Sequence, residues 1–446
     1  MATIHPDSLE GHPSRLLGWA AERARSVLER GGTPDEALKQ TFIDALARTI
    51  REAMRAQAGD PAFQAMVLGH GHAHVRDYAS LSAQAGQDRR QLQTAINAIA
   101  HPARRERMSP GALRNALARL HSAASAGSWG ELDSILRDLL AMPGIGQDTP
   151  LAGSLARLRD GPALARLKRL EALSSHESVH RYQALREARG PRPGSATATE
   201  QGDASQKRGR AVEASAAQAI GALARLLDEA EGGGERFRVV TSMRVPSSIP
   251  ADPDRAKTEW DAVLLRRAVS AEEAPVWDIC LLVEAKASVE AATTDLPRLL
   301  RGIGLLTHAD EDVVYSFQAR EGRVRLRGAS LRALATDEAG LARTVLYCSD
   351  APVETPPRLL GAASRMQFLS ARPSLEFAAG LADRREADPR LLEPVWCDLL
   401  HSPGWRAVLN QYRTLCQARA LMVHVDDLAA AIDGAAGDYR AGSIPG

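Results

Sequence analysis

Long apolar runs and aromatic residues are scarce in this sequence of 446 residues. No stretch approaches the roughly 18 apolar residues that a membrane-spanning helix needs, so we expect no membrane span. The beginning of the chain carries Asp7, Glu10 and Glu22 and lacks the apolar core of a secretory signal. This predicts a cytoplasmic protein, although export as an effector by a route without such a signal stays open. Aromatics make up 4% and alanine is abundant, which favours helices over a large all-β architecture.

Cysteine and lysine are also rare. The four cysteines lie far apart without CxxC spacing, which excludes a zinc-ribbon pattern. Cys280 and Cys348 fall inside apolar runs, so they predict buried free thiols in a reducing compartment. The formal net charge is +1. No global field therefore draws the chain to nucleic acid, and any such affinity must come from local arginine clusters.

The apolar spacing changes along the chain and divides it into four parts. Residues 1–189 repeat apolar residues at helical spacing and predict a helical domain of open role. Residues 190–206 are rich in Gly, Pro, Ser and Thr and predict a flexible linker. Residues 207–350 mix helices and strands, and residues 351–446 are helical again. We expect this last part to pack on the middle domain or to extend it.

Two runs in the middle domain have the length and the branched, aromatic composition of strands. They cover residues 258–267 and 276–287, and the turn-like SAEEAP between them predicts a hairpin. The second run contains a continuous apolar segment, which is typical of a strand covered on both faces.

The apolar segment ends in the tripeptide Glu284-Ala285-Lys286. Side chains alternate along a strand, so Glu284 and Lys286 leave the sheet on one face, and Asp261 of the neighbouring strand can reach that face. The simplest alternative is an exposed ion pair at a fraying strand end. Against it, the tripeptide directly follows a core segment, and lysine is otherwise almost replaced by arginine. The pattern favours a metal site with a positive group beside it. The lysines of the chain are Lys39, Lys168, Lys207, Lys257 and Lys286.

Three histidines in the first part form a second candidate for metal binding. His70, His72 and His74 alternate with Gly and Ala, and on a helix or a strand at least two of them would share a face. A solvated loop explains the same pattern, and the sequence does not decide between the two.

The order of elements in the middle domain resembles that of the PD-(D/E)xK nuclease superfamily, which has the restriction-endonuclease-like fold. The expected elements are a helix at 207–231, strands at 237–243, 258–267 and 276–287, a helix at 288–306 and a strand at 313–318. The resemblance implies an α/β (α+β mixed) αβββαβ core, flanked here by all-α regions. Its specific residues are Glu213 on the first helix, Asp261, and the tripeptide at Glu284.

The resemblance implies a Mg²⁺- or Mn²⁺-dependent nuclease, for which hard oxygen ligands are suitable. Asp261, Glu284 and the Ala285 carbonyl would hold the metal, and Lys286 would orient or deprotonate the attacking water. Glu213 would hold the metal or a water beside it. Two further roles are expected: Arg298 and Arg301 would touch the phosphate backbone, and Glu259 is an additional acid or the true ligand in place of Asp261.

We therefore expect an enzyme that hydrolyses phosphodiester bonds, with DNA favoured over RNA as the substrate, in a setting such as bacterial defence or effector action. The alternatives are a nuclease-like scaffold that has lost catalysis and a helical interaction protein that binds nucleic acid or a protein. The helical N-terminal domain is the expected surface for a protein partner. The sequence leaves open sequence specificity, endo- or exonucleolytic action and the oligomeric state.

Overall fold

The computed structural model describes residues 9, 11–143, 145, 150–190, 195–252, 254–269, 274–352, 358–383 and 387–440. The chain forms two compact units. The helical unit comprises residues 47–191 and 368–395, and the sheet unit comprises residues 1–46, 192–367 and 396–446. These boundaries differ from the predicted ones, because the two ends of the chain belong to the unit that contains the sheet. No helix in the described ranges is long and apolar enough to cross a membrane.

The helical unit is built around the long helix α4, which packs against α3, α6 and α9. Its apolar core is formed by leucines and alanines that recur at helical spacing. Asp88 is the buried acid of this core, and it receives two hydrogen bonds from Arg166, at 2.6 and 2.9 Å. The helices of this unit are α3 (Pro61–Gly71), α4 (Ala73–Ala100), α5 (Pro102–Glu106), α6 (Ala112–Ala126), α7 (Trp129–Leu140), α8 (Pro150–Arg159), α9 (Pro162–Leu173), α10 (Glu177–Ala188), α16 (Arg372–Ala382) and η2 (Pro389–Leu392).

The described residues of the sheet unit form seven strands in the order β2-β1-β4-β5-β3-β6-β7. Because β2 also pairs with β3, the first five strands of this order close on themselves as a small barrel. Strand β6 lies parallel to β3, and β7 lies parallel to β6. The strands are β1 (Phe237–Arg244), β2 (Glu259–Arg267), β3 (Trp277–Ala285), β4 (Val314–Ala319), β5 (Gly322–Arg327), β6 (Val345–Ser349) and β7 (Met422–His424).

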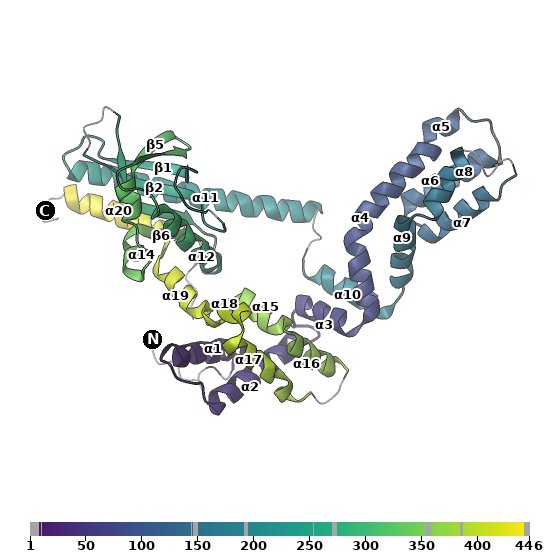
Figure 1. Cartoon of the computed structure of the whole chain (residues 1–446), viewed down its shortest axis with the longest axis horizontal. Helices are drawn as coiled ribbons and strands as arrows, with labels where there is room; N and C mark the ends of the chain where they lie inside the picture. The colour runs from purple at the N-terminus through teal and green to yellow at the C-terminus, as the bar shows by residue number, and fades with distance from the viewer. Residues whose placement is uncertain are drawn as a thin grey trace. The chain divides into compact units, whose positions relative to one another are not determined.

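Helices cover both faces of the sheet formed by β2, β3 and β6. Helix α11 (Ala196–Ala230) packs Ala216 and Ile220 onto Val283 and Cys348, and α20 (Val425–Arg440) packs beside α11 (Figure 1). On the opposite face, α12 (Val289–Leu306) packs its leucines against the larger core, which also fills the ring of strands. Helix α19 (Gln411–Ala420) packs against α12.

The remaining helices of the chain are short, apart from the first two. Helix α2 crosses the boundary between the two units, and so do α15 and α17. These elements are α1 (Pro13–Glu29), α2 (Glu36–Ala53), α13 (Gly328–Arg332), α14 (Glu338–Thr344), α15 (Ala362–Ser370), α17 (Glu393–His401), η3 (Pro403–Trp405) and α18 (Arg406–Leu409).

The expected mixed α/β class is confirmed, and the expected strands and the helix at 288–306 are found within a few residues of their predicted bounds. The linker prediction is wrong for residues 196–206, which form the first turns of α11, while residues 191–194 lie outside the described residues. The Ser195 side chain accepts a hydrogen bond from the Ala198 N–H at 3.2 Å and caps this helix. Residues 270–273 of the predicted hairpin tip at 270–275 also lie outside the described residues.

Candidate active site at the ends of strands β2 and β3

Two carboxylates meet where β2 begins and β3 ends. The strands are antiparallel with Ala262 opposite Val283, so Asp261 and Glu284 are the next facing pair on the other side of the sheet. Asp261 accepts a hydrogen bond from the Ala285 N–H at 2.8 Å. This bond ties the start of β2 to the end of β3. Asp261 lies on the face of the sheet on which the alternation of side chains places it.

Glu284 is the most deeply buried acid of the site, with none of its surface exposed. Its Oε2 atom lies 2.5 Å from Nζ of Lys257 and 3.1 Å from Nζ of Lys286. Its Oε1 atom is buried and has no hydrogen-bond partner among the described residues. Burial raises the pKa of Glu284 to about 8, and Asp261 adds to this shift while the two lysines oppose it.

Lys257 lies in the segment before β2 and is 6% exposed. Its backbone N–H donates to the carbonyl of Arg298 on α12 at 3.0 Å. A Cβ atom at Gly302 of the same helix would lie 2.6 Å from the Lys257 carbonyl oxygen, so only glycine permits this close approach. The ammonium group also lies 6.0 Å from the centre of the Trp260 ring. Helix α12 thus fixes the backbone from which Lys257 reaches Glu284.

Helix α12 also supplies an acid to the site. Asp295 lies 3.5 Å from Nζ of Lys286 and accepts a hydrogen bond from the Tyr347 hydroxyl of β6 at 3.3 Å. Burial raises the pKa of Tyr347, and Asp295 and Glu284 add to the shift, so the phenol stays protonated at neutral pH. Burial alone would lower the pKa of Lys286, but the nearby carboxylates outweigh it and raise that pKa. Lys286 is therefore a permanent positive charge in the cation-free protein.

Glu213 lies at the margin of this group, on the exposed side of α11. Partial burial raises the pKa of Glu213, and the charge of Asp261 adds to this effect while Lys286 lowers it. Four predicted residues are thus linked by their charges, because Asp261 and Lys286 shift the pKa values of both Glu213 and Glu284. We call them, together with Lys257, Asp295 and Tyr347, the Glu284 cluster.

Three predicted site residues are not brought into the Glu284 cluster. Glu259 pairs with Arg244 of β1 at 3.1 Å and is partly exposed. The side chains of Arg298 and Arg301 are exposed, and Nε of Arg301 donates to the Arg255 carbonyl at 2.9 Å. Both arginines lie on the surface of α12, the helix that carries Asp295. Their expected roles in binding phosphate stay predictions.

No family model, curated protein or solved structure matches the chain significantly.

In the described part of the chain, no three His, Cys, Asp or Glu side chains are arranged to hold a metal ion together. This includes the predicted histidine motif, in which the ring of His74 stacks on that of His176 at 4.2 Å. The Glu284 cluster therefore offers a metal two facing carboxylates rather than a complete set of side-chain ligands.

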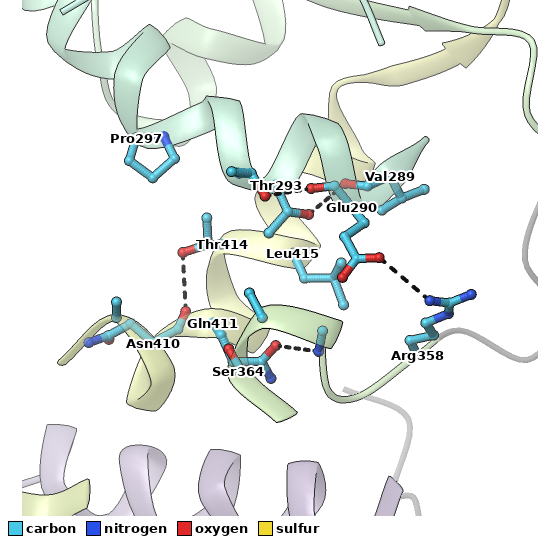
Figure 2. A pocket seen from close by; sticks show the side chains of 14 residues that line it. Val289, Glu290, Thr293, Pro297, Arg358, Ser364, Asn410, Gln411, Thr414 and Leu415 are labelled. Atoms are coloured by element: carbon cyan, nitrogen blue, oxygen red, sulfur yellow. Dashed lines mark hydrogen bonds and ion pairs between the residues drawn. The ribbon is translucent and has the colours of Figure 1, made fainter. Parts of the chain in front are cut away.

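A separate cavity of about 260 Å³ lies on the outer side of α12 and shares no residue with the Glu284 cluster. Figure 2 shows Glu290 extending from α12 toward Arg358, and the two side chains lie 3.6 Å apart. Glu290 also accepts the N–H of Ala362 at 2.6 Å, which holds the start of α15 against α12. Gln411 closes the opposite wall with hydrogen bonds to Gly361 and Leu359.

Sequence reasoning missed Lys257, Asp295 and Tyr347. Lysine is rare in this chain, and that scarcity was a usable signal for Lys257 as it was for Lys286. Asp295 is a single acid on an amphipathic helix, which ordinarily marks a solvated position. Tyr347 stands in a short apolar strand, where a core position is the natural expectation.

Proposed function

We propose that this protein is a metal-dependent nuclease whose active site is the Glu284 cluster, with DNA as the favoured substrate. The observation that carries the proposal is a fully buried carboxylate, Glu284, which faces Asp261 across a strand pair and has one oxygen without a partner among the described residues. Burial of a carboxylate is costly, and the ammonium groups of Lys257 and Lys286 compensate it at Oε2 while Oε1 is left without a partner among the described residues. Groups with strongly shifted pKa values cluster at functional sites.

The residues of the cluster fit a hard divalent cation. When ionised, its four carboxylates and two ammonium groups leave two negative charges, which one Mg²⁺ or Mn²⁺ would balance. Glu284 Oε1 and Asp261 would be the ligands, and the Ala285 carbonyl stands next to them in the chain. Oxygen donors of this kind suit these metals better than zinc.

The bound metal would polarise the phosphate and lower the pKa of an attacking water. The residues of the chain would do the rest. Because Lys286 stays protonated, it would orient the nucleophile and stabilise charge on the phosphate rather than remove a proton. Asp295 and Glu284 hold its ammonium group from two sides, at 3.5 and 3.1 Å. Asp261 would keep the ends of β2 and β3 in register through its bond to Ala285.

The order of elements around the cluster also supports the proposal. Helix α11 precedes the antiparallel strands β1, β2 and β3, and α12 then leads to β6, which lies parallel to β3. This resembles the αβββαβ order of the PD-(D/E)xK superfamily only if β6 takes the last place, with β4, β5, α13 and α14 between α12 and β6. The strand expected in that place, at 313–318, is β4, which pairs antiparallel with β1 and β5. Strands β1 to β5 close into a ring, so the resemblance rests on the strands that carry the acids.

The direct test is cleavage of supercoiled plasmid by the full-length protein with Mg²⁺, Mn²⁺ or EDTA. We expect metal-dependent nicking that Asp261→Asn and Lys286→Met abolish while both variants keep the helical content of the parent. Lys39→Met, which removes a lysine outside the cluster, is the matched control and should cleave normally. Folded protein that cleaves neither plasmid, single-stranded DNA nor RNA under any of these conditions would refute the proposal and favour a non-catalytic scaffold.

A further inference from the structure

Two of the five lysines in the chain contact the same carboxylate oxygen. Lys257 and Lys286 come from different segments, and both place Nζ on Oε2 of Glu284, at 2.5 and 3.1 Å. Lys286 has a second acidic partner in Asp295. Lys257 forms a single ion pair among the described residues, and its partner is Glu284.

The backbone of Lys257 is held in place by the fold. Its N–H is bonded to the Arg298 carbonyl, and its backbone lies directly on Gly302. The side chain is 7% exposed and passes beside the ring of Trp260. A lysine loses considerable rotamer freedom when it is buried in this way. Two backbone contacts, one to Arg298 and one to Gly302, therefore hold the segment that brings the charge of a second lysine to the buried Glu284.

That charge opposes a second cation at the same place. A divalent ion at Glu284 would stand within a few ångströms of the Lys257 ammonium, in surroundings where water screens charges weakly. The metal ion and the Lys257 ammonium would repel each other if both were bound to the carboxylate of Glu284. An ammonium on a flexible stem can leave, since Lys257 has four rotatable bonds and α12 fixes its backbone only.

We propose that Lys257 is an exchangeable internal cation, which occupies Glu284 when no divalent metal is bound and gives way when one binds. The inference rests on the proposed metal site and adds a mechanism of regulation to it. Lys257 sets the metal concentration at which the site fills, because every binding event must displace its ammonium group. The protein is then folded and inactive at low metal, and an added anionic substrate phosphate favours the exchange by attracting the released ammonium group.

The test is calorimetric titration of Mn²⁺ into chelator-treated full-length protein. We expect Lys257→Met to bind Mn²⁺ at least tenfold more tightly than the parent, a gain of about 1.4 kcal/mol. Lys168→Met, the same substitution in the helical unit, should leave the affinity unchanged. Gly302→Ala keeps the lysine but forces its backbone away from α12, so it should also tighten binding, and it decides the question if Lys257→Met does not fold.

The outcomes separate this inference from the nuclease proposal. If the parent binds Mn²⁺ and Lys257→Met binds it equally or more weakly, the inference is overturned and the nuclease proposal is left standing. Tighter binding in Lys257→Met without cleavage of any nucleic acid supports the exchange and refutes the nuclease. Absence of Mn²⁺ binding in the parent and in both variants overturns the two together.

Discussion

The buried carboxyl group of Glu284 makes the stability of the sheet unit depend on pH in an unusual direction. Most acids in proteins have a lowered pKa, so stability rises with pH as they ionise. The pKa of Glu284 is instead raised from 4.5 to about 8, chiefly by burial. The folded protein therefore binds a proton that the unfolded chain has released between these two values. The contribution of the protonated Glu284 carboxyl group to stability is complete below pH ~4.5 and is lost as pH rises to ~8.

The size of this loss follows from the two pKa values. Each pH unit over which the folded state alone holds the proton changes the free energy of unfolding by about 1.4 kcal/mol. The full interval of about 3.5 pH units then amounts to roughly 5 kcal/mol, a large part of the total stability of a typical domain. The amide that Glu284→Gln introduces does not ionise, so that variant should lack this loss.

The assay is urea denaturation of the parent and of Glu284→Gln in EDTA, from pH ~5 to pH ~8.5. Other titrating groups are shared, so the difference between the two proteins isolates Glu284. We expect the variant to gain relative to the parent by about 2 to 4 kcal/mol across this range. Parallel profiles, or a parent that gains on the variant, would show that Lys257 and Lys286 outweigh burial and that the reasoning is wrong.

Two further predictions concern features away from the cluster. Ser195→Ala removes the cap of α11, so it should cost about 1 kcal/mol and increase hydrogen exchange of the amides near Ala198. Cys348 is buried and its pKa is raised to about 12, whereas Cys397 and Cys416 are exposed, so a thiol reagent should label the last two rapidly and Cys348 only after unfolding.

Each of these two experiments has an internal control. Ser205→Ala makes the same chemical change at an exposed position inside α11, where alanine favours helix, so it should not increase exchange. If both serine variants behaved alike, the cap would have no measurable role. Rapid labelling of Cys348 in the native protein would mean that the layer of α11 over the sheet opens readily.

The strands that carry the acids could be predicted because their sequence signals are local. A five-residue apolar run at 279–283 ends at Glu284, and alternation alone then places Glu284 and Lys286 on one face. The register that sets Asp261 against Glu284 follows once the hairpin is recognised. Glu259 shares the alternation of Asp261, but its side chain pairs with Arg244 of β1, a strand that lies outside the hairpin of β2 and β3.

Other features could not be predicted because they depend on contacts between distant segments. Lys257 reaches Glu284 only because α12 bears a glycine at position 302, and no local pattern reports such a contact. Strand β7 has three residues, too few for periodicity to reveal, and it exists because β6 offers it an edge. The start of α11 was mistaken for a linker because its residues bury almost nothing, although alanine and a serine cap suffice to form the helix.

The sheet unit is assembled from three separate stretches of the chain, and this has a consequence for its synthesis. Strand β6 has emerged from the ribosome long before residues 422–424, which become its neighbour β7. Until then β6 is an unpaired edge of the kind that associates with other strands. The residues translated in between include α16, which belongs to the helical unit. The β6 edge of the sheet in a newly made chain should therefore stay unpaired until the last part of translation, and loss of the C-terminal segment should lead to aggregation rather than to a smaller folded protein.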